Sequence, residues 1–387
     1  MKKLIFSLSI LAALFTGCTS TDSDTQTKPT VEGELSGDIT GTRTLEKGNY
    51  KLTSSIRVKS GGILTIAAGS VLTAQDNNGL ITLTVEKGGK INLIGNAAEP
   101  IICTSVTKTP GAWGGIVLYG DAKIVPSISG TTATSEDGTN TTYGGSSNTT
   151  SGTLKYVRVE YAGRKIADGT KELNAFSFYA VGSDTVLDHL VAYKGSDDGF
   201  EFYGGTVSMT NAIAYGNTDD SFDWQDGWQG QNNSNWYAYQ TGTGNYGMEI
   251  EAKGVNNSFY PVVTGITLKR EAGTVTEGGS STAEYDAIQF KKEGNGFYTN
   301  ILIEGYTDAN AVAVRIQDAA TNTNQVTGSK IKLTGVKIVG TTPLQGVGAT
   351  GFTVAFPTGF YTTSTTSVGA SITNGAWSTV NGVSLIK

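Results

Sequence analysis

Apolar and polar residues alternate in short segments along most of the chain, and these segments recur. One set of segments is about eight residues long and comprises 154–161, 187–194, 209–216, 233–240, 263–270, 298–305 and 333–340. A shorter set falls between them, at 174–178, 198–202, 220–224, 246–250, 286–290 and 310–314. The tightest repeats are 22 residues, from Leu187 to Met209, and 24 residues, from Met209 to Asn233. Alternation predicts strands, and the Gly, Asn and Asp residues between the segments predict tight corners.

Stacking is the arrangement that lets such repeats bury their apolar faces. Two strands alone cannot do so, but stacked repeats share one continuous core and place like positions about 4.8 Å apart. We therefore predict an all-β fold, a right-handed single-stranded parallel β-helix (a β-solenoid), over residues 41–387. Residues 120–152 are rich in Gly, Ser and Thr and are expected to form a flexible insertion. Residues from about 341 are expected to cap the open end, whose strand edge would otherwise recruit other strands.

The N-terminus predicts export and a lipid anchor. Two lysines precede an apolar stretch from Leu4 to Phe15, and small residues then lead to Cys18. This pattern is typical of a secretory signal peptide, residues 1–17, and its end resembles the lipobox of bacterial lipoproteins, where the new N-terminal cysteine is acylated. We predict lipidation of Cys18 and a disordered tether, residues 18–40. An ordinary signal peptide followed by a chance cysteine is the alternative.

Location and charge narrow the class of partner. The acidic residues just behind Cys18 resemble a surface-export signal of Bacteroidetes lipoproteins, which favours an outer-membrane lipoprotein exposed on the cell surface; a periplasmic-facing anchor is the alternative. The formal net charge is −6, which lacks the basic footprint of nucleic-acid binding. The partners expected are the membrane, through the lipid, and polysaccharide or other envelope proteins.

Five short motifs stand in a fixed order between about residues 55 and 339. They are Gly111-Ala-Trp-Gly-Gly-Ile-Val-Leu-Tyr-Gly120, Tyr156-Val-Arg-Val-Glu-Tyr-Ala-Gly163, Glu172-Leu-Asn174, Ser196-Asp-Asp-Gly-Phe-Glu-Phe-Tyr-Gly-Gly205 and Asp219-Asp-Ser-Phe-Asp-Trp224. In this order they resemble a widespread group of uncharacterised right-handed parallel β-helix surface proteins and lipoproteins, common in Bacteroidetes. The resemblance implies the fold and an envelope location. It implies no activity.

Stacking would bring acidic residues into one outward column. The middle positions of the shorter segments point outward if their flanking positions point inward, and they read Ser177, Glu201, Asp223, Glu249, Gln289 and Ala313. Carboxylates about 4.8 Å apart repel by roughly 3–4 kcal/mol at an effective dielectric of about 20, but by under about 1 kcal/mol in water. The three acids therefore form a solvated stripe if they are exposed. If they are covered, they form a Ca²⁺ site, because all donors are oxygens, or a catalytic group.

Aromatic residues gather in the same coils. An outward column of the longer segments contains Tyr193, Tyr215 and Tyr239, and Tyr237, Trp228 and Tyr246 lie near it. Exposed aromatic strips rarely stay bare, and flat rings beside carboxylates and amides suit sugar rings. These six residues are the candidate ligand-binding residues. Alternatively, the 120–152 insertion or a partner covers them.

Paired acids at two corners raise the question of catalysis. Asn217-Thr-Asp-Asp220 is similar to a motif of polygalacturonase-type β-helix hydrolases, but the only histidine, His189, lies in a different strand set, so the required histidine coil is missing. Inverting hydrolysis needs only two carboxylates roughly 6.5–9.5 Å apart. Asp198, Asp220 and Asp223 are therefore the candidate catalytic residues. The structural alternative is that Asp tolerates turn geometry.

The sequence leaves three functional hypotheses. The first is a non-catalytic, lipid-anchored β-helix that binds a glycan or another extracellular ligand. The second is a purely structural or adhesive envelope protein. The third is a polysaccharide-active hydrolase or lyase that uses the aspartate cluster.

Overall fold

The computed structural model describes residues 31–387, except 76–78, 167–170, 259, 278–283, 310, 341–351 and 355. Val31–Lys387 forms one compact unit. The predicted signal peptide, Cys18 and the start of the predicted tether lie outside the described residues. No helix within the described residues is long and apolar enough to cross a membrane.

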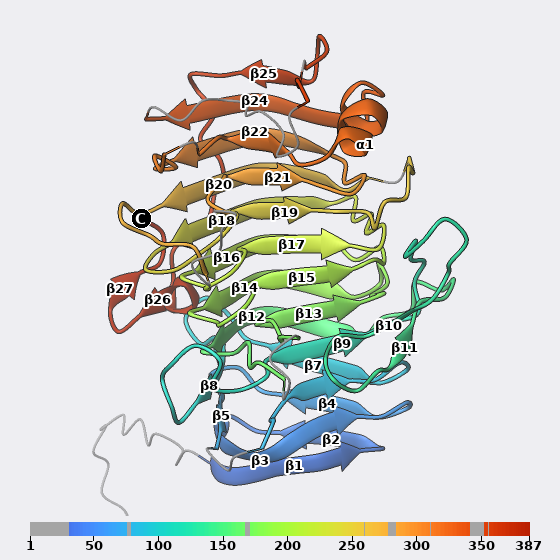
Figure 1. The fold of residues 1–387 in the computed structure, drawn as a ribbon. Coiled ribbons are helices and arrows are strands. Elements are labelled where there is room, and N and C mark those ends of the chain that lie inside the picture. The colour runs from blue at the N-terminus through green and yellow to red at the C-terminus, as the bar shows by residue number, and fades with distance from the viewer. Residues whose placement is uncertain are drawn as a thin grey trace, which may run out of the picture. The chain divides into compact units, whose positions relative to one another are not determined.

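Parallel strands stack in register from one end of the unit to the other (Figure 1). A column of short strands carries the shorter sequence repeat: β6 (Leu83–Val85), β9 (Ile116–Tyr119), β13 (Phe176–Tyr179), β15 (Phe200–Tyr203), β17 (Phe222–Gln225), β19 (Met248–Ile250), β21 (Ile288–Phe290) and β23 (Val314–Ile316). Together with the other coil strands they form one 23-stranded sheet. The predicted parallel β-helix is confirmed, and its right-handed winding stays a prediction.

The longer repeat forms bent strands: β12 (Gly152–Glu160), β14 (Val186–Tyr193), β16 (Met209–Tyr215), β18 (Asn233–Gln240), β20 (Val262–Arg270), β22 (Gly296–Glu304) and β24 (Ile331–Val339), followed by β25 (Tyr361–Thr363). Each of the seven long strands bends at one residue with a positive φ, between 51° and 77°: Tyr156, His189, Asn211, Asn235, Gly265, Asn300 and Gly335. Asn and Gly tolerate this left-handed conformation best. The positions of His189, Asn211, Asn235 and Asn300 are therefore a stack of corners.

Below β12 the two halves of the bent strands are separate strands. β7 (Lys90–Ile94) pairs with the first half of β12, and β8 (Ile101–Ser105) pairs with the second half. The preceding strands are β1 (Val31–Ile39), β2 (Thr42–Leu45), β3 (Gly48–Val58), β4 (Ile63–Ile66) and β5 (Val71–Ala74). β1 corrects the predicted tether, which was expected to be disordered as far as residue 40. The strand was missed because its buried residues Leu35 and Ile39 lie four apart among Gly and acidic residues.

The interior is a stack of apolar and aromatic rings. Phe176 stacks on Phe200 at 5.0 Å between ring centroids, and Phe200 on Phe222 at 5.5 Å. Such offset stacks add to the free energy gained by burying each ring. The inward positions of β13, β15 and β17 are thus all aromatic, and the outward position between them can carry a polar side chain.

Residues 120–152, predicted to be a flexible insertion, fold back onto the coils. They contain the hairpin β10 (Ala133–Thr134) and β11 (Thr142–Tyr143). Tyr143 is buried and its hydroxyl donates to Asp226, while the hydroxyl of Tyr119 donates to Asp137 at 2.6 Å. The insertion thus covers the outward tyrosines at the ends of β9, β13 and β15 (Tyr119, Tyr179 and Tyr203).

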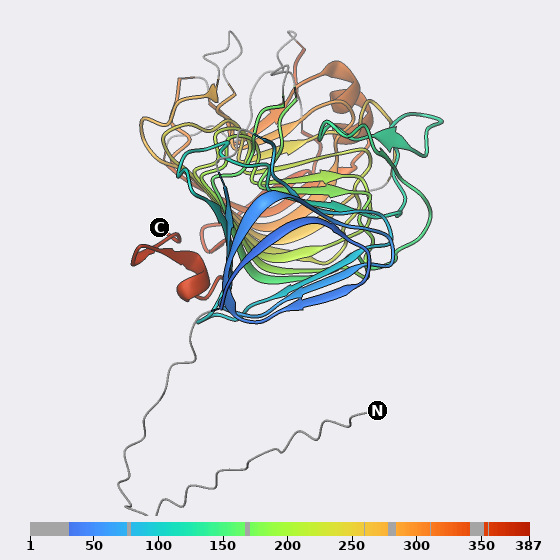
Figure 2. The same ribbon diagram turned by 90° about the horizontal axis from the view of Figure 1, so that it is seen from below.

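The end of the chain does not act only as a cap. A short helix α1 (Ala319–Thr321) and a π turn η2 (Asn322–Val326) precede β24, and β25 extends the stack. Residues 364–387, which we call the C-terminal segment, instead run along the outside of the bent strands (Figure 2). This segment contains η3 (Ala376–Ser378) and the hairpin β26 (Thr379–Val380) with β27 (Val383–Ser384). The prediction that the chain caps the stack from about residue 341 is therefore corrected for residues 364–387, which lie on the outside of the bent strands. Residues 341–351 lie outside the described residues.

Candidate functional site

The three predicted acids stand in one column. Glu201 pairs in register with Asp223, and Asp223 with Glu249. The column continues to Gln289 and then to Arg315, not to Ala313 as predicted. The sequence alignment slipped by two residues because 312–314 and 314–316 both alternate between apolar and other positions. Ala313 is buried.

The corner aspartates hold successive coils together. Oδ1 of Asp198 accepts the backbone N–H of Asp220 at 2.9 Å, and Oδ1 of Asp220 accepts that of Tyr246 at 2.6 Å. Asn174 makes the same contact one coil earlier, to the N–H of Asp198. This repeated hydrogen bond explains why Asn or Asp occupies the corner, so that Asp220 has a structural task whether or not it has a catalytic one.

A cleft of about 320 Å³ opens over the acidic column. Nine acidic residues and three lysines line it, so acids strongly outnumber cations. We call it the acidic cleft and define it by Glu201, Asp223 and Glu249 from the strands, Asp197, Asp198 and Asp219 from the corners, Glu136 from the insertion, and Lys253 and Lys291. The insertion therefore forms one wall of the candidate site.

Burial and mutual repulsion favour the neutral form of these acids. Burial raises the pKa of Glu201 to about 7, and burial with the charge of Glu249 raises the pKa of Asp219 to about 7. The pKa values of Asp198 and Asp223 are also raised, first by burial and then by neighbouring carboxylates. The predicted alternative of a fully solvated stripe is wrong, because Glu201 and Asp223 are buried.

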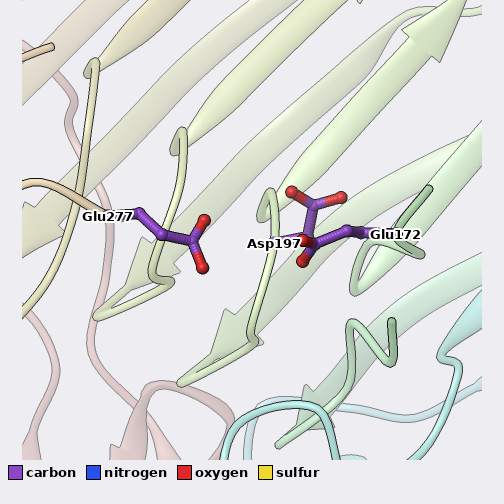
Figure 3. A group of neighbouring side chains, drawn as sticks. All are labelled: Glu172, Asp197 and Glu277. Atoms are coloured by element: carbon purple, nitrogen blue, oxygen red, sulfur yellow. The ribbon is translucent and has the colours of Figure 1, made fainter. Parts of the chain in front are cut away.

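The acids form three overlapping groups in which the carboxylate oxygens lie within 4.8 Å of one another. The groups are Asp198, Glu201 and Asp223; Asp197, Asp198 and Asp219; and Glu172, Asp197 and Glu277. In the last group Glu172 and Asp197 lie together and Glu277 points toward them (Figure 3). Lys165 contacts both glutamates of that group and offsets part of their charge.

Lysines offset the negative charge of Glu249 and Glu251 at one end of the cleft. Lys291 pairs with Glu249 and lies 3.7 Å from Glu251, which also contacts Lys292 at 2.8 Å and Lys253 at 3.3 Å. Although burial opposes it, the charge of Glu249 raises the pKa of Lys291. The fold brings Lys253, Lys291 and Lys292 beside the acids from the turns that follow β19 and β21.

Four buried side-chain oxygens that line the cleft have no hydrogen-bond partner among the described residues. Two of them, Oδ1 of Asp223 and Oε1 of Gln225, come from the same strand; the others are Oε2 of Glu172 and Oε1 of Glu251, and the latter lies 3.3 Å from Nζ of Lys253. Asp223 is 9% exposed and Gln225 is 5% exposed, and both line the cleft from β17. A buried polar atom without a partner usually costs 1–3 kcal/mol. Such a cost is often tolerated at sites that bind something.

A second pocket adjoins the cleft on the side of the C-terminal coils. It has a volume of about 550 Å³ and shares Glu249 and Lys291 with the acidic cleft. Gln289, Gln317 and the exposed Ala320 of α1 line its far part. We call the two pockets together the axial groove. From β15 to β23 it crosses four coil steps, about 19 Å at the usual strand spacing.

The structure contradicts a ligand-contacting role for three aromatic candidates. Trp228 is 1% exposed and lies in the core against Phe202, with 4.3 Å between the ring centroids. Tyr237 is 3% exposed beneath the C-terminal segment, and its hydroxyl bonds the backbone of Lys387. Tyr246 is buried, and its hydroxyl accepts from Gln289 at 2.6 Å.

The other three aromatic candidates, Tyr193, Tyr215 and Tyr239, form a stack that we call the tyrosine ladder, in which Tyr193 is buried and the other two are partly buried. Their ring centroids lie 5.6 and 5.1 Å apart at interplanar angles of 24° and 19°. Both faces of Tyr215 are therefore covered by its neighbours. A sugar ring stacks on an open aromatic face, and the middle of this ladder offers only ring edges.

Several residues of the candidate site escaped the sequence reading. Gln225 is the last residue of β17, Lys291 and Lys253 lie in the turns after β21 and β19, and Glu136 and Glu277 come from loops. Of these residues, Gln225 could have been predicted from the sequence, because it stands two residues after Asp223 and must lie on the same face of the strand. Nothing in the repeat fixes where the loop residues fall.

The match to a family model agrees with this architecture. A family model described as a pectate-lyase-like β-helix domain matches residues 37–380. Among solved structures, the A-module of mannuronan C-5 epimerase AlgE6 from Azotobacter vinelandii is 14% identical, with 79% of each chain covered and a TM-score of 0.37. No curated protein matches the chain. The family match spans most of the sequence, and the chain thus belongs to the family of pectate-lyase-like β-helix domains.

Proposed function

We propose that this protein is a lipid-anchored envelope protein that binds an extracellular polysaccharide in the axial groove. The anchor is Cys18, and outward display on the outer membrane is part of the proposal, with a periplasmic-facing anchor as its alternative. The observation that carries the binding function is that the acidic cleft and the second pocket adjoin, because Glu249 and Lys291 line both.

The groove suits a long, hydroxyl-rich chain. It runs along the axis on which the coils repeat. A polymer whose repeat is similar to one coil step would therefore contact the equivalent position of each successive coil. Its walls carry carboxylates, amides and ammonium groups, which donate to and accept from hydroxyls. Its size falls within the usual range of ligand sites, roughly 300–1,000 Å³.

A steric block tests this proposal without disturbing the core. Ala320 is exposed and lines the groove, so Ala320→Trp fills part of the groove from α1. We expect at least a tenfold loss of affinity for whichever polysaccharide a glycan array identifies, measured by calorimetric titration. Ala272→Trp is the matched control, because Ala272 is also exposed and lies outside both pockets.

A third variant decides between the groove and the tyrosine ladder. Tyr215→Ala removes the middle ring of the ladder and is expected to leave polysaccharide affinity unchanged. Loss of binding in Tyr215→Ala with normal binding in Ala320→Trp would transfer the site to the ladder. An absence of binding to every glycan would favour a structural or adhesive role.

A polysaccharide-active enzyme is the second candidate function, and the state of Glu201 favours it. With its pKa near 7, Glu201 can hold a proton near neutral pH and pass it to a glycosidic oxygen, as a general acid does. Asp223 is its nearest partner in the column. If the protein cleaves a polysaccharide, we expect Glu201→Gln to lower kcat at least a hundredfold while leaving binding within threefold.

A further inference from the structure

We propose that the lower part of the acidic cleft holds one Ca²⁺ ion between Asp198, Glu201, Asp223 and Gln225. This site differs from the column of Glu201, Asp223 and Glu249, because Glu249 is already neutralised by Lys291. The binding of the ion does not depend on the proposed function. Only its role rests on that function, because the ion would there contact oxygens of the polysaccharide in the same groove.

The spacing of the carboxylates fits one shared ion. Oxygens of Asp198, Glu201 and Asp223 all lie within 4.8 Å of one another. Two oxygens bound to the same Ca²⁺ at about 2.3–2.6 Å can lie at most about 5.2 Å apart. The three side chains therefore need no large movement to become ligands.

The unpartnered oxygens identify the position more closely than the negative charge does. Oδ1 of Asp223 and Oε1 of Gln225 are buried, line the cleft and have no hydrogen-bond partner. They lie two residues apart on β17 and so face the same side of the strand. The amide nitrogen of Gln225 donates to Oε1 of Glu201 at 2.7 Å, which orients the amide and fixes Glu201 beside it.

Fixed partners hold the other ligands in place. Oε2 of Glu201 accepts from Nδ2 of Asn174 at 2.6 Å and from the hydroxyl of Tyr203. Oδ1 of Asp198 accepts the N–H of Asp220. A carboxylate oxygen has two lone pairs, so Oε2 of Glu201 is fully used, but Oε1 of Glu201 and Oδ1 of Asp198 each accept one hydrogen bond and keep a lone pair for a cation.

The donor set selects the class of ion. All four side chains offer oxygen, and Ca²⁺ accepts carboxylate and amide oxygens in flexible geometry. Zinc and copper favour imidazole and thiolate ligands. The described residues of this cleft contain no histidine or cysteine.

Direct titration tests the site in the absence of any polysaccharide, so its failure is separate from failure of the proposed function. The purified protein, treated with a chelator and then dialysed, is titrated with CaCl₂ by calorimetry. Tb³⁺ is used in parallel, because Tyr203 lies against Glu201 and would sensitise Tb³⁺ luminescence at this site. We expect one Ca²⁺ to bind and Tb³⁺ luminescence to appear on tyrosine excitation and disappear on adding Ca²⁺.

Three variants complete the test. Asp223→Asn is expected to weaken Ca²⁺ binding at least tenfold, and Gln225→Met, which removes an oxygen but no charge, at least threefold. Asp184→Asn, at an exposed carboxylate outside the cleft, is expected to leave affinity unchanged. The inference is overturned if the wild-type protein gives no Ca²⁺ binding, or if a folded Gln225→Met and Asp223→Asn bind as the wild type does. If Asp223→Asn fails to fold, unchanged affinity in Gln225→Met overturns it.

Discussion

In the absence of divalent cations, the protein is expected to lose stability as the pH rises from about 5 to about 8. The pKa of Glu201 is about 7 in the fold, against 4.5 as an ordinary glutamate. Between these values the folded state binds more protons than the unfolded state, so the free energy of unfolding falls as pH rises. The stabilisation is fully present below the unfolded pKa and is lost as pH rises through 7. The difference corresponds to roughly 3 kcal/mol for Glu201 alone.

Urea unfolding at pH 5, 6, 7 and 8 in the presence of a chelator measures this effect. Glu201→Gln should flatten the pH dependence, because a neutral amide no longer titrates. Glu304→Gln is the control, since the pair of Glu304 with Lys269 is partly exposed and lies outside the cleft. Stability that stays constant or rises over this range would contradict a buried, protonated Glu201.

The repeat in the sequence predicts the fold because it specifies which positions become neighbours. Phe176, Phe200 and Phe222 recur at matching positions, and their stacking in the core follows directly. The same logic correctly places Glu201, Asp223 and Glu249 in one column. Where two alternating registers are equally apolar, as around Val314, the repeat cannot choose between them, and the prediction of Ala313 failed there.

The remainder of the candidate site depends on contacts that no repeat encodes. Glu136 reaches the cleft from an insertion whose position is fixed by the hydrogen bond from Tyr143 to Asp226, 83 residues apart in sequence. Alternation also shows that Val191, Ile213 and Tyr237 point outward, but not what covers them. An outward apolar strip looks the same in sequence whether a ligand, a partner or the chain's own end lies upon it.

Trp377→Ala is expected to release the C-terminal segment from the coils. Trp377 is 1% exposed and its ring meets Tyr156 and His189 edge-on, at 5.8 and 4.9 Å between centroids. Replacing a buried tryptophan by alanine typically costs about 3–5 kcal/mol. The segment is an outer layer, so this loss should open it locally before the coils unfold. Hydrogen exchange should therefore accelerate in residues 364–387, while β14, β16 and the short-strand column keep their protection, because their amides bond to neighbouring coils.

The anchoring of the segment makes this expectation specific. Nη1 of Arg158 donates to the carbonyls of Ala376, Trp377 and Thr379 at 3.0–3.2 Å, and Asn235 accepts the N–H of Ser371 at 3.0 Å. These bonds orient the segment, but each of the bonded groups can bond to water instead once the tryptophan is removed. A typical hydrogen bond contributes only about 1 kcal/mol net to stability. Val383→Ala, at an exposed residue of β27, is the matched control and should leave exchange unchanged. Unaltered protection of the segment in Trp377→Ala would mean that the polar contacts, not the buried ring, hold it in place.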